Sequence, residues 1–248
     1  MKIIAIIPAR YASTRFPGKP LLKIYEKTMI NHVYNQVSKV FDTIYVATDD
    51  DRIKNEVKRF GGNVILTSKY HKSGTDRCAE AIIKIQRMLA KNFDVVINIQ
   101  GDEPFIKIEQ LNSIISSFEN PSTQIATLAK RIENSEEIFN PNSVKIIFSE
   151  QKEAIYFSRS PIPYIRDNSK EFWNVKHDFY KHIGLYGYKT SVLEKISKLK
   201  QTPLELAESL EQLRWIENGF KIKVEITKHE SISIDTENDL KLLLQHRR

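Results

Sequence analysis

The chain opens with IIAIIPARYASTRFPGKPLL, residues 3–22, and this stretch decides the fold. Its first part is an unbroken apolar run that stops at Pro8, which is typical of a strand buried on both faces in a parallel sheet covered by helices. The second part carries three cations, Arg10, Arg15 and Lys19, among small and hydroxylic residues. Open α/β sheets bind their ligands at the carboxyl ends of their strands. The sequence therefore predicts an α/β fold with a ligand-binding loop directly after the first strand.

The basic loop has the chemistry of an anion site. Arginine offers a planar fork of donors for phosphate oxygens, and lysine offers a compact charge. Backbone amides near Ser13 and Gly18 can supply the neutral part of the cradle. The sequence contains neither G-x-x-x-x-G-K-[ST] nor G-x-G-x-x-G, so a nucleoside triphosphate would be bound by a different route. Taken alone, the residues leave open a solvated basic turn.

Composition limits the class of protein. A chain of 248 residues is long enough for one α/β domain of enzyme size with a subsidiary lobe. The formal net charge is +7, but the lysines are scattered and no nucleic-acid motif occurs, so we expect no nucleic-acid partner. The single cysteine, Cys78, fits a reducing compartment. The apolar N-terminal run is too short to span a membrane and lacks signal-peptide features. We expect a soluble, cytoplasmic protein without a membrane partner.

Strands and helices alternate over the first half of the sequence. After the first strand, further strands are predicted at 43–48, 64–66, 94–99 and 125–128. Apolar stripes at helical spacing separate them, and this alternation favours a parallel sheet. The acidic run Asp49 to Asp51 follows one strand, and we expect it to cap the next helix rather than to bind a metal ion.

The pattern changes in the second half. Antiparallel strands are predicted at 144–148 and 154–157, and an irregular loop follows over 158–176. Long loops in compact domains usually bind ligands or form contact surfaces. We therefore expect a lobe at about 144–190 to bind a second substrate and to contact another chain.

Two loops of the first half suggest contacts with a nucleotide. Asp102 follows the strand at 94–99, so it lies at the same sheet edge as the basic loop if the two strands are parallel. A carboxylate there suits Mg²⁺ bridging phosphates, although a helix cap is an equal alternative on the residues alone. Ser73, Gly74 and Thr75 suit the edge of a nucleobase, with Gly74 admitting close approach, but a turn that merely caps a helix is favoured without further information.

Other candidates have ordinary structural interpretations. His182 alone is more often a structural histidine. A single helix is predicted over about 206–216. Its apolar stripe contains Leu206, Leu210, Leu213 and Ile216, and its solvated polar face carries Glu211, Gln212 and Arg214. Asp235 cannot be distinguished from a capping aspartate.

The order of these motifs resembles the sugar-acid cytidylyltransferases, in particular those that act on 3-deoxy-manno-octulosonate (Kdo). The matching blocks are PARYASTRFPGKPL at 8–21, HKSGTDR at 71–77, NIQGDEP at 98–104, FNPN at 139–142, YFSR at 156–159, HIGLYGY at 182–188, LEQLR at 210–214 and DT at 235–236. They cover nearly the whole chain. The family pattern continues with proline and glutamate, whereas Glu237 and Asn238 stand here, so the start of the terminal helix is left open.

The resemblance implies a Rossmann-like nucleotidyltransferase fold. It implies a mixed, mostly parallel central sheet flanked by helices, in one domain over 1–248 with a smaller dimerisation and sugar-binding lobe at about 144–190. The implied reaction converts CTP and Kdo to CMP-Kdo and diphosphate for lipopolysaccharide biosynthesis. The anomeric hydroxyl of Kdo would attack the α-phosphate in line with the leaving group, assisted by Mg²⁺. A homodimer is implied by the resemblance alone.

The resemblance also assigns roles to individual residues. The implied CTP-binding residues are Ala9, Arg10, Ser13, Arg15, Lys19, Ser73, Gly74, Thr75, Arg77 and Gln100. The implied Kdo-binding residues are Arg159, His182, Tyr186, Glu211 and Gln212. The implied catalytic residues are Arg10, Arg15, Lys19, Asp102 and Asp235, with both aspartates as Mg²⁺ ligands.

Two alternatives to this function differ in what they predict. Transfer to another acid sugar, such as a sialic acid, is the nearest, but that related family carries a different small-residue and lysine pattern in the basic loop. A catalytically silent nucleotide-binding regulator is the second. The presence of Lys19, Asp102 and Asp235 together argues against it.

Overall fold

The computed structural model describes residues 1–12, 16–230, 234 and 239. The chain divides into two compact units. The first unit comprises 1–112, 189–197 and 231–248, and the second comprises 113–188 and 198–230. No helix in the described part of the chain is both long and apolar enough to cross a membrane.

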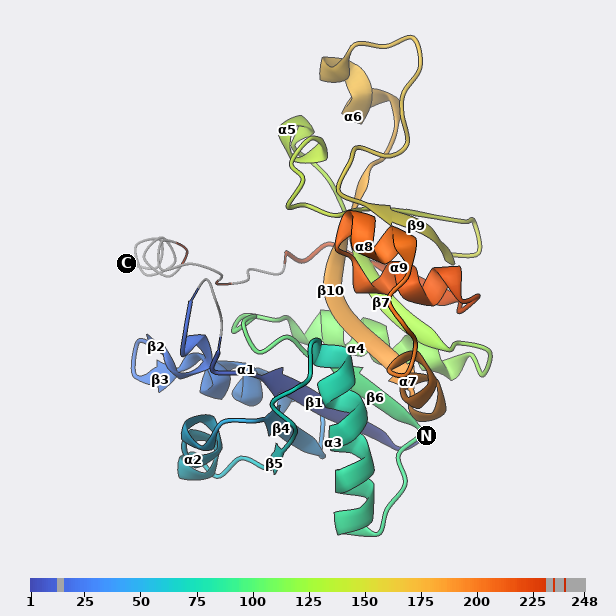
Figure 1. The fold of residues 1–248 in the computed structure, drawn as a ribbon. Helices are drawn as coiled ribbons and strands as arrows, with labels where there is room; N and C mark the ends of the chain where they lie inside the picture. The colour runs from blue at the N-terminus through green and yellow to red at the C-terminus, as the bar shows by residue number, and fades with distance from the viewer. Residues whose placement is uncertain (13–15, 231–233, 235–238, 240–248) are drawn as a thin grey trace. The chain divides into compact units, whose positions relative to one another are not determined.

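The first unit contains parallel strands in the order β6-β1-β4-β5 (Figure 1). Their bounds are Ile3–Ala9 for β1, Ile44–Thr48 for β4, Val64–Leu66 for β5 and Val95–Asn98 for β6. Ala5 of β1 pairs with Ile44 on one side and Ile97 on the other. Ile4 to Ile7 have no exposed surface, which confirms the predicted doubly buried strand. Because β1 and β6 are parallel neighbours, the loops that follow them leave the same edge of the sheet.

Helices pack on this sheet and a short hairpin follows the basic loop. The helices that contact the sheet are α1 (Met29–Val37), α2 (Asp51–Arg59), α3 (Gly74–Leu89) and α7 (Thr190–Ile196). The short helix η1 (Lys19–Leu21) contacts α1 and α2, and the hairpin strands are β2 (Lys23–Ile24) and β3 (Lys27–Thr28). The Asp50 side chain accepts a hydrogen bond from the Arg52 amide at 2.9 Å, so the predicted acidic cap of α2 is confirmed. Cys78 is buried within α3.

The second unit contains a mixed set of strands. They are β7 (Ile125–Arg131), β8 (Lys145–Phe148), β9 (Ala154–Ser158), β10 (Tyr180–Lys189) and β11 (Ile222–Thr227). Strand β11 pairs with β7 in parallel, whereas β7–β10, β10–β8 and β8–β9 are antiparallel. The predicted antiparallel pair after residue 144 is therefore confirmed, and so is the predicted class, a mixed and mostly parallel α/β fold.

Short helices complete the second unit. They are η2 (Ser117–Glu119), α5 (Ser135–Ile138), η3 (Lys170–Phe172), α6 (Trp173–Lys176), α8 (Pro203–Glu208) and α9 (Glu211–Glu217), while α4 (Ile108–Ser116) spans the boundary between the units in the sequence. The long loop expected over 158–176 thus ends in helical turns. Trp173 there is buried with Ile132, Ile138 and Phe179, so the segment has a small core of its own. The lobe expected at 144–190 lies within this unit up to residue 188.

The single helix predicted over about 206–216 is wrong. Ser209 adopts a left-handed backbone with φ of 53° and Leu210 is extended, so the chain forms two helices, α8 and α9. The supposed apolar stripe is interrupted as well, since Leu206 is 61% exposed. The polar face is not fully solvated either, because Gln212 and Arg214 are buried.

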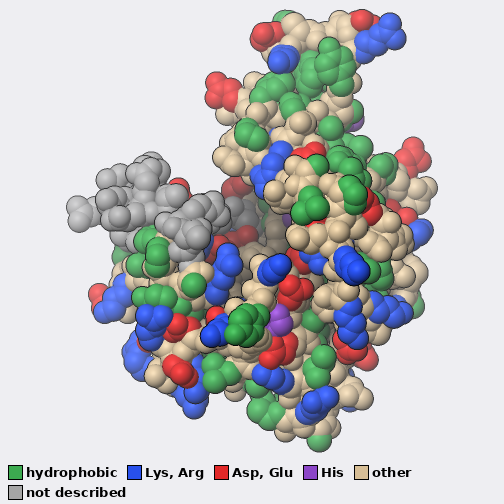
Figure 2. Space-filling view, in the orientation of Figure 1, with side chains coloured by type: hydrophobic (Ala, Val, Ile, Leu, Met, Phe, Trp, Pro, Cys, Tyr) green, Lys and Arg blue, Asp and Glu red, His purple; other side chains and the backbone are tan. Residues whose placement is uncertain are grey.

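Charge is distributed without a basic stripe on the face shown in Figure 2. Among the coloured, described residues of that face, Lys and Arg side chains lie interspersed with Asp and Glu side chains. The scattered lysines of the sequence are therefore scattered on this surface too. The cations that gather around one cavity lie at the sheet edge of the first unit instead.

Candidate functional site

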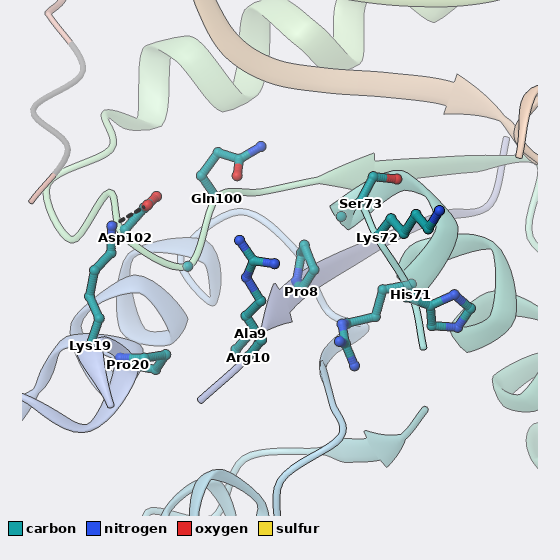
Figure 3. A pocket seen from close by; sticks show the side chains of 13 residues that line it. Pro8, Ala9, Arg10, Lys19, Pro20, His71, Lys72, Ser73, Gln100 and Asp102 are labelled. Atoms are coloured by element: carbon teal, nitrogen blue, oxygen red, sulfur yellow. Dashed lines mark hydrogen bonds and ion pairs between the residues drawn. The ribbon is translucent and has the colours of Figure 1, made fainter. Parts of the chain in front are cut away.

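A cavity of about 230 Å³ lies at the carboxyl ends of β1 and β6 in the first unit (Figure 3). Three segments line it: the start of the basic loop with η1, the loop that enters α3, and the loop after β6. The lining residues are Pro8, Ala9, Arg10, Lys19, Pro20, His71, Lys72, Ser73, Gly74, Arg77, Gln100, Gly101 and Asp102. Segments far apart in the sequence thus meet where the sheet-edge argument placed them.

Two of these segments, the loop after β6 and the loop that enters α3, pack closely against Pro8. A Cβ atom added at Gly101 would lie 3.1 Å from the Pro8 carbonyl oxygen, and one added at Gly74 would lie 3.3 Å from Pro8 Cγ. Both contacts are tight, so glycine lets each loop reach the end of β1. The structure shows a close approach of Gly74 to Pro8, and its approach to a ligand stays a prediction.

Lys19 and Asp102 form the central ion pair of the cavity. Lys19 Nζ lies 2.6 Å from Asp102 Oδ2, and the lysine side chain is only 12% exposed (Figure 3). Gly18, with φ of 73°, turns the chain into η1 and so aims Lys19 at the sheet edge. Opposite charges held this close keep each other compensated in the absence of a ligand.

Other predicted members of the basic loop and metal site are less completely described. Arg10 lines the cavity and is exposed. Ser13, Arg15 and Asp235 lie outside the described residues. Ile234, the residue before Asp235, is buried, and its amide donates a hydrogen bond to the Asp102 carbonyl oxygen at 3.1 Å.

Arg77 is a buried connector at the edge of the cavity. Its Nη1 donates to Thr67 Oγ1 at 2.6 Å, and its Nη2 lies 3.2 Å from Asp49 Oδ1. Burial lowers the pKa of Arg77, and the neighbouring Asp49 carboxylate opposes that change. Arg77 therefore joins the segments that follow β4 and β5 to helix α3. Asp49 was predicted only as part of a helix cap, because its partner Arg77 lies 28 positions further along the chain.

The start of α3 combines a cap with a cavity wall. Ser73 Oγ accepts a hydrogen bond from the Asp76 amide at 3.1 Å, so the capping interpretation of this turn is correct. Ser73 and Gly74 also line the cavity, whereas Thr75 is buried and is not among the lining residues. Gln100 lines the cavity from the loop after β6.

His71 and Glu80 form a pair that the sequence did not single out. Glu80 accepts hydrogen bonds from His71 Nε2, from the Ser68 amide at 2.9 Å and from Lys84 Nζ at 2.6 Å. Burial raises the pKa of Glu80, but the bonds from Lys84, Ser68 and His71 outweigh it and lower that pKa to about 2. His71 lies in the matched block 71–77, in the loop before α3, and Glu80 lies nine positions later on that helix.

The second unit places the partly buried His182 and the buried Tyr186 in one aromatic cluster. Their ring centroids lie 5.2 Å apart, and Tyr186 is also 5.2 Å from the Trp215 ring. The pairing of β10 with β7 shifts between Ile183 and Tyr186, and the His182 and Tyr186 rings are nevertheless in contact. Burial lowers the pKa of His182 to about 3 and raises that of Tyr186, so both side chains stay uncharged. His182 Nε2 lies 2.9 Å from Thr127 Oγ1.

Helix α9 brings two further predicted residues to this cluster. Gln212 is buried, and the Glu211 carboxylate is close enough to Tyr186 to raise its pKa further. Arg214 donates two hydrogen bonds to Glu205 at 2.6 and 2.8 Å and also lies 3.6 Å from the Glu211 carboxylate. Lys19 and Asp102 in the first unit are thus held as an ion pair, whereas burial keeps His182 and Tyr186 in the second unit uncharged.

Arg159 sits beside the end of α8. Its Nε donates to the Glu208 carbonyl oxygen at 2.8 Å and its Nη1 to the Pro141 carbonyl oxygen at 3.0 Å. Its own amide donates to the Glu208 carboxylate at 2.9 Å. The fork that was predicted to hold a sugar carboxylate is therefore partly engaged by the backbone, and its role stays a prediction.

Comparisons with known proteins identify the family of the chain. A model of the cytidylyltransferase family matches residues 4–226. The 3-deoxy-manno-octulosonate cytidylyltransferase of Parabacteroides distasonis is 56% identical and covers 98% of this chain and 97% of its own length. The enzyme of that name from Bacteroides thetaiotaomicron is 57% identical, covering 97% and 96%.

Solved structures are similar as well. The structure of CMP:2-keto-3-deoxy-manno-octonic acid synthetase complexed with CTP has a TM-score of 0.90 and 38% identity, covering 99% of this chain and 98% of that one. A cytidylyltransferase from Leptospira borgpetersenii, at a TM-score of 0.62 and 18% identity over 98% of this chain and 85% of that one, shares the fold. The chain therefore belongs to the 3-deoxy-manno-octulosonate cytidylyltransferase family.

Proposed function

We propose that this chain transfers the cytidylyl group of CTP to Kdo and releases pyrophosphate. The main support is the Lys19–Asp102 pair, which stands in a cavity at the edge of a parallel sheet between the basic loop and the loop that enters α3. Family membership supplies the identity of the substrates, since relatives at 56% and 57% identity carry that activity in their names. A structure of 38% identity was solved with CTP.

The cavity suggests an orientation for CTP. Lys19 and Asp102 lie at one end of the lining, and His71, Lys72 and Ser73 lie at the other, with Arg10 and Gln100 between them (Figure 3). Cations suit the phosphates. We therefore assign the triphosphate to the Lys19 end, the base to the loop that enters α3, and the ribose to Gln100. Ala9, Ser73, Gly74 and Arg77 complete the proposed wall, and Ser13, Arg15 and Thr75 are carried as expectations of the family.

Ligand binding would exchange partners within the Lys19–Asp102 pair. Lys19 would turn from the carboxylate to a phosphate oxygen, which offers the same charge in a similar place. Asp102 would then be available to a cation. The charge of each side chain stays compensated before and after the exchange, so neither is left uncompensated in a partly buried site.

Mg²⁺ is the cofactor that this donor set fits. Asp102 presents hard carboxylate oxygens to the cavity, and no cluster of three or more His, Cys, Asp or Glu side chains suited to a metal occurs among the described residues. Mg²⁺ is commonly held by one or two carboxylates together with substrate phosphates. Asp235 is the proposed second carboxylate, since it follows Ile234, which is bonded to the Asp102 backbone. When bound, Mg²⁺ would supply charge stabilisation at the α-phosphate and would lower the pKa of the attacking hydroxyl.

The side chains of this chain would act mainly by position and charge. Arg10, Arg15 and Lys19 would stabilise the negative charge that spreads over the phosphoryl oxygens as pyrophosphate departs. The anomeric hydroxyl would be held in line with the leaving group, so no covalent enzyme intermediate is required.

The second unit is the proposed site for the sugar acid. Neutral His182 and Tyr186, together with Glu211 and Gln212, offer donors and acceptors that suit sugar hydroxyls. Arg159 is the proposed partner of the Kdo carboxylate. A homodimer, a cytoplasmic location and a role in lipopolysaccharide biosynthesis are further proposals that rest on family membership.

Release of pyrophosphate tests this function. The purified protein is incubated with CTP, Mg²⁺ and Kdo, and a parallel reaction contains a sialic acid in place of Kdo. We expect pyrophosphate and CMP-Kdo only in the first reaction. Release with the sialic acid alone would change the assigned sugar, and no release in either reaction would favour a silent nucleotide-binding protein.

A further inference from the structure

The side chain of Glu80 connects helix α3 to the base end of the nucleotide cavity. Its two oxygens accept hydrogen bonds from Lys84 on the same helix, from the Ser68 amide and from His71 Nε2. His71 itself lines the cavity beside Lys72 and Ser73. Glu80 is not among the lining residues, so any effect it has on a nucleotide acts through His71.

The hydrogen bond to Glu80 decides which nitrogen of His71 carries the proton. A carboxylate with a pKa of about 2 is ionised at neutral pH and can only accept hydrogen bonds. His71 Nε2 must therefore be the donor. In the neutral imidazole the other nitrogen, Nδ1, is then an acceptor. Among the described residues His71 Nδ1 makes no hydrogen bond, so it is the ring atom left to meet a ligand.

An acceptor at this end of the cavity distinguishes the two pyrimidines. Cytosine carries an exocyclic amine, which is a donor, at the position where uracil carries a carbonyl oxygen, which is an acceptor. An acceptor nitrogen bonds the first and repels the second. Sites built on such a bond discriminate strongly, because the wrong ligand leaves a desolvated polar group without a partner.

We propose that Glu80 is a positioning residue that fixes the tautomer of His71, and that His71 Nδ1 thereby selects cytosine over uracil in the nucleotide. The inference rests on the proposed function, because it assigns the base to the α3 end of the cavity. It adds to that function His71 as a residue that determines base specificity, and Glu80 as the carboxylate that fixes which nitrogen of His71 carries the proton.

Binding of CTP and UTP to the full chain, measured by titration calorimetry without sugar, tests the pair. His71→Phe keeps a ring but removes the acceptor, and we expect the ratio of CTP to UTP affinity to fall roughly tenfold. The amide of Glu80→Gln can donate as well as accept, so either nitrogen of His71 could then carry the proton. The ratio of CTP to UTP affinity should fall by a smaller factor. Lys84→Gln removes another partner of Glu80 outside the cavity and should leave the ratio unchanged.

A purely structural role of the pair gives a different result. If His71 and Glu80 only anchor the loop, His71→Phe and Glu80→Gln would weaken CTP and UTP equally, and the unchanged ratio would overturn the inference. A wild-type protein that binds both nucleotides equally, or neither, would overturn it as well. Circular dichroism confirms that each variant is folded, and Glu80→Gln serves as the test should His71→Phe fail to fold.

Failure of the proposed function is separable from failure of this inference. Preferred binding of CTP with the expected variant effects, but no pyrophosphate release with Kdo, would support the pair and contradict the reaction. Normal release with CTP and Kdo, with an unchanged nucleotide preference in His71→Phe, would do the reverse.

Discussion

The proposed nucleotide cavity of the first unit and the aromatic cluster of the second differ in the charge state of their side chains. The cavity holds its side chains as charged pairs: Lys19 with Asp102, and Arg77 with Asp49. The cluster around His182 and Tyr186 keeps polar groups uncharged by burying them. A triphosphate requires exchangeable charge, whereas sugar hydroxyls require neutral donors and acceptors. Under the proposed function, the difference would suit two chemically unlike substrates.

The same contrast is visible in two pKa values that move in one direction for opposite reasons. Hydrogen bonds from Lys84, Ser68 and His71 overcome burial to bring the pKa of Glu80 to about 2, which keeps that group charged. Burial brings the pKa of His182 to about 3, which keeps that group neutral. Mutations should therefore affect charge compensation in the first unit and desolvation in the second.

The largest expected effect is at the charged site. Asp102→Asn removes the proposed metal ligand and the partner of Lys19 while preserving shape, and turnover should fall at least about a thousandfold. Pyrophosphate release with CTP and Kdo measures it. Asp51→Asn is the matched control, since Asp51 also follows a parallel strand but lies on α2, and its activity should be normal. A fully active Asp102→Asn would remove Asp102 from the mechanism.

The second prediction concerns the stability of the second unit rather than catalysis. Glu205→Gln breaks the buried pair with Arg214, whose side chains are 7% and 9% exposed, and should cost about 3 kcal/mol of unfolding free energy. Both tryptophans, Trp173 and Trp215, lie in this unit, so their fluorescence in urea reports it.

An exposed acid on the neighbouring helix provides the comparison. Glu217→Gln should leave the urea midpoint within experimental error. An equal midpoint for Glu205→Gln and wild type would mean that the pair adds nothing to the fold. CTP binding should be unchanged in both variants, because the nucleotide cavity is lined by residues of the first unit.

Acid should destabilise the second unit before it affects Glu80. The unfolded chain takes up a proton at His182 near pH 6.5, while the folded chain does so only near pH 3, so the unfolded state binds more protons between these values. Stability from this residue is present above pH 6.5 and is lost as the pH falls toward 3. Between pH 6.5 and 5 the loss should reach about 2 kcal/mol.

Tryptophan fluorescence at several pH values measures this slope. His182→Gln should flatten it, and the exposed His177→Gln should not. Glu80 has an ordinary value of 4.5 in the unfolded chain, so its contribution should be lost only below that pH. A slope in His182→Gln identical to that of wild type would show that His182 is not responsible.

The smallest expected effect concerns one hydroxyl group. Tyr186→Phe keeps the ring contacts with His182 and Trp215 but removes a proposed donor to Kdo, so the KM for Kdo should rise roughly tenfold. The KM for CTP should stay the same. Tyr188→Phe, on the neighbouring stacked ring, is the control. A change in the KM for CTP but not for Kdo would contradict the assignment of Kdo to the second unit.

The site of the first unit could be predicted from the sequence because the loops that follow neighbouring parallel strands lie at the same edge of the sheet. Once β1 and β6 are taken as parallel neighbours, Lys19 and Asp102 must follow strands that end at one edge. The pair of Arg77 with Asp49 could not be found in this way. It depends on where two loops and a helix meet in space, and periodicity contains no information on that.

The second unit was harder to predict because its polar residues are buried. Arg214 and Gln212 look like a solvated helix face in the sequence, yet Glu205 compensates the first and both are buried. Apolar and polar patterning cannot distinguish an exposed charge from a paired one. The helix break at Ser209 was not predicted because serine rarely adopts a left-handed backbone.

A structure of the protein in complex with CTP and Mg²⁺ tests the central claim most directly. We expect the triphosphate beside Lys19, the metal on the Asp102 carboxylate, and the base against the loop that enters α3. A nucleotide bound away from this cavity, or a metal ion that does not touch Asp102, would contradict it.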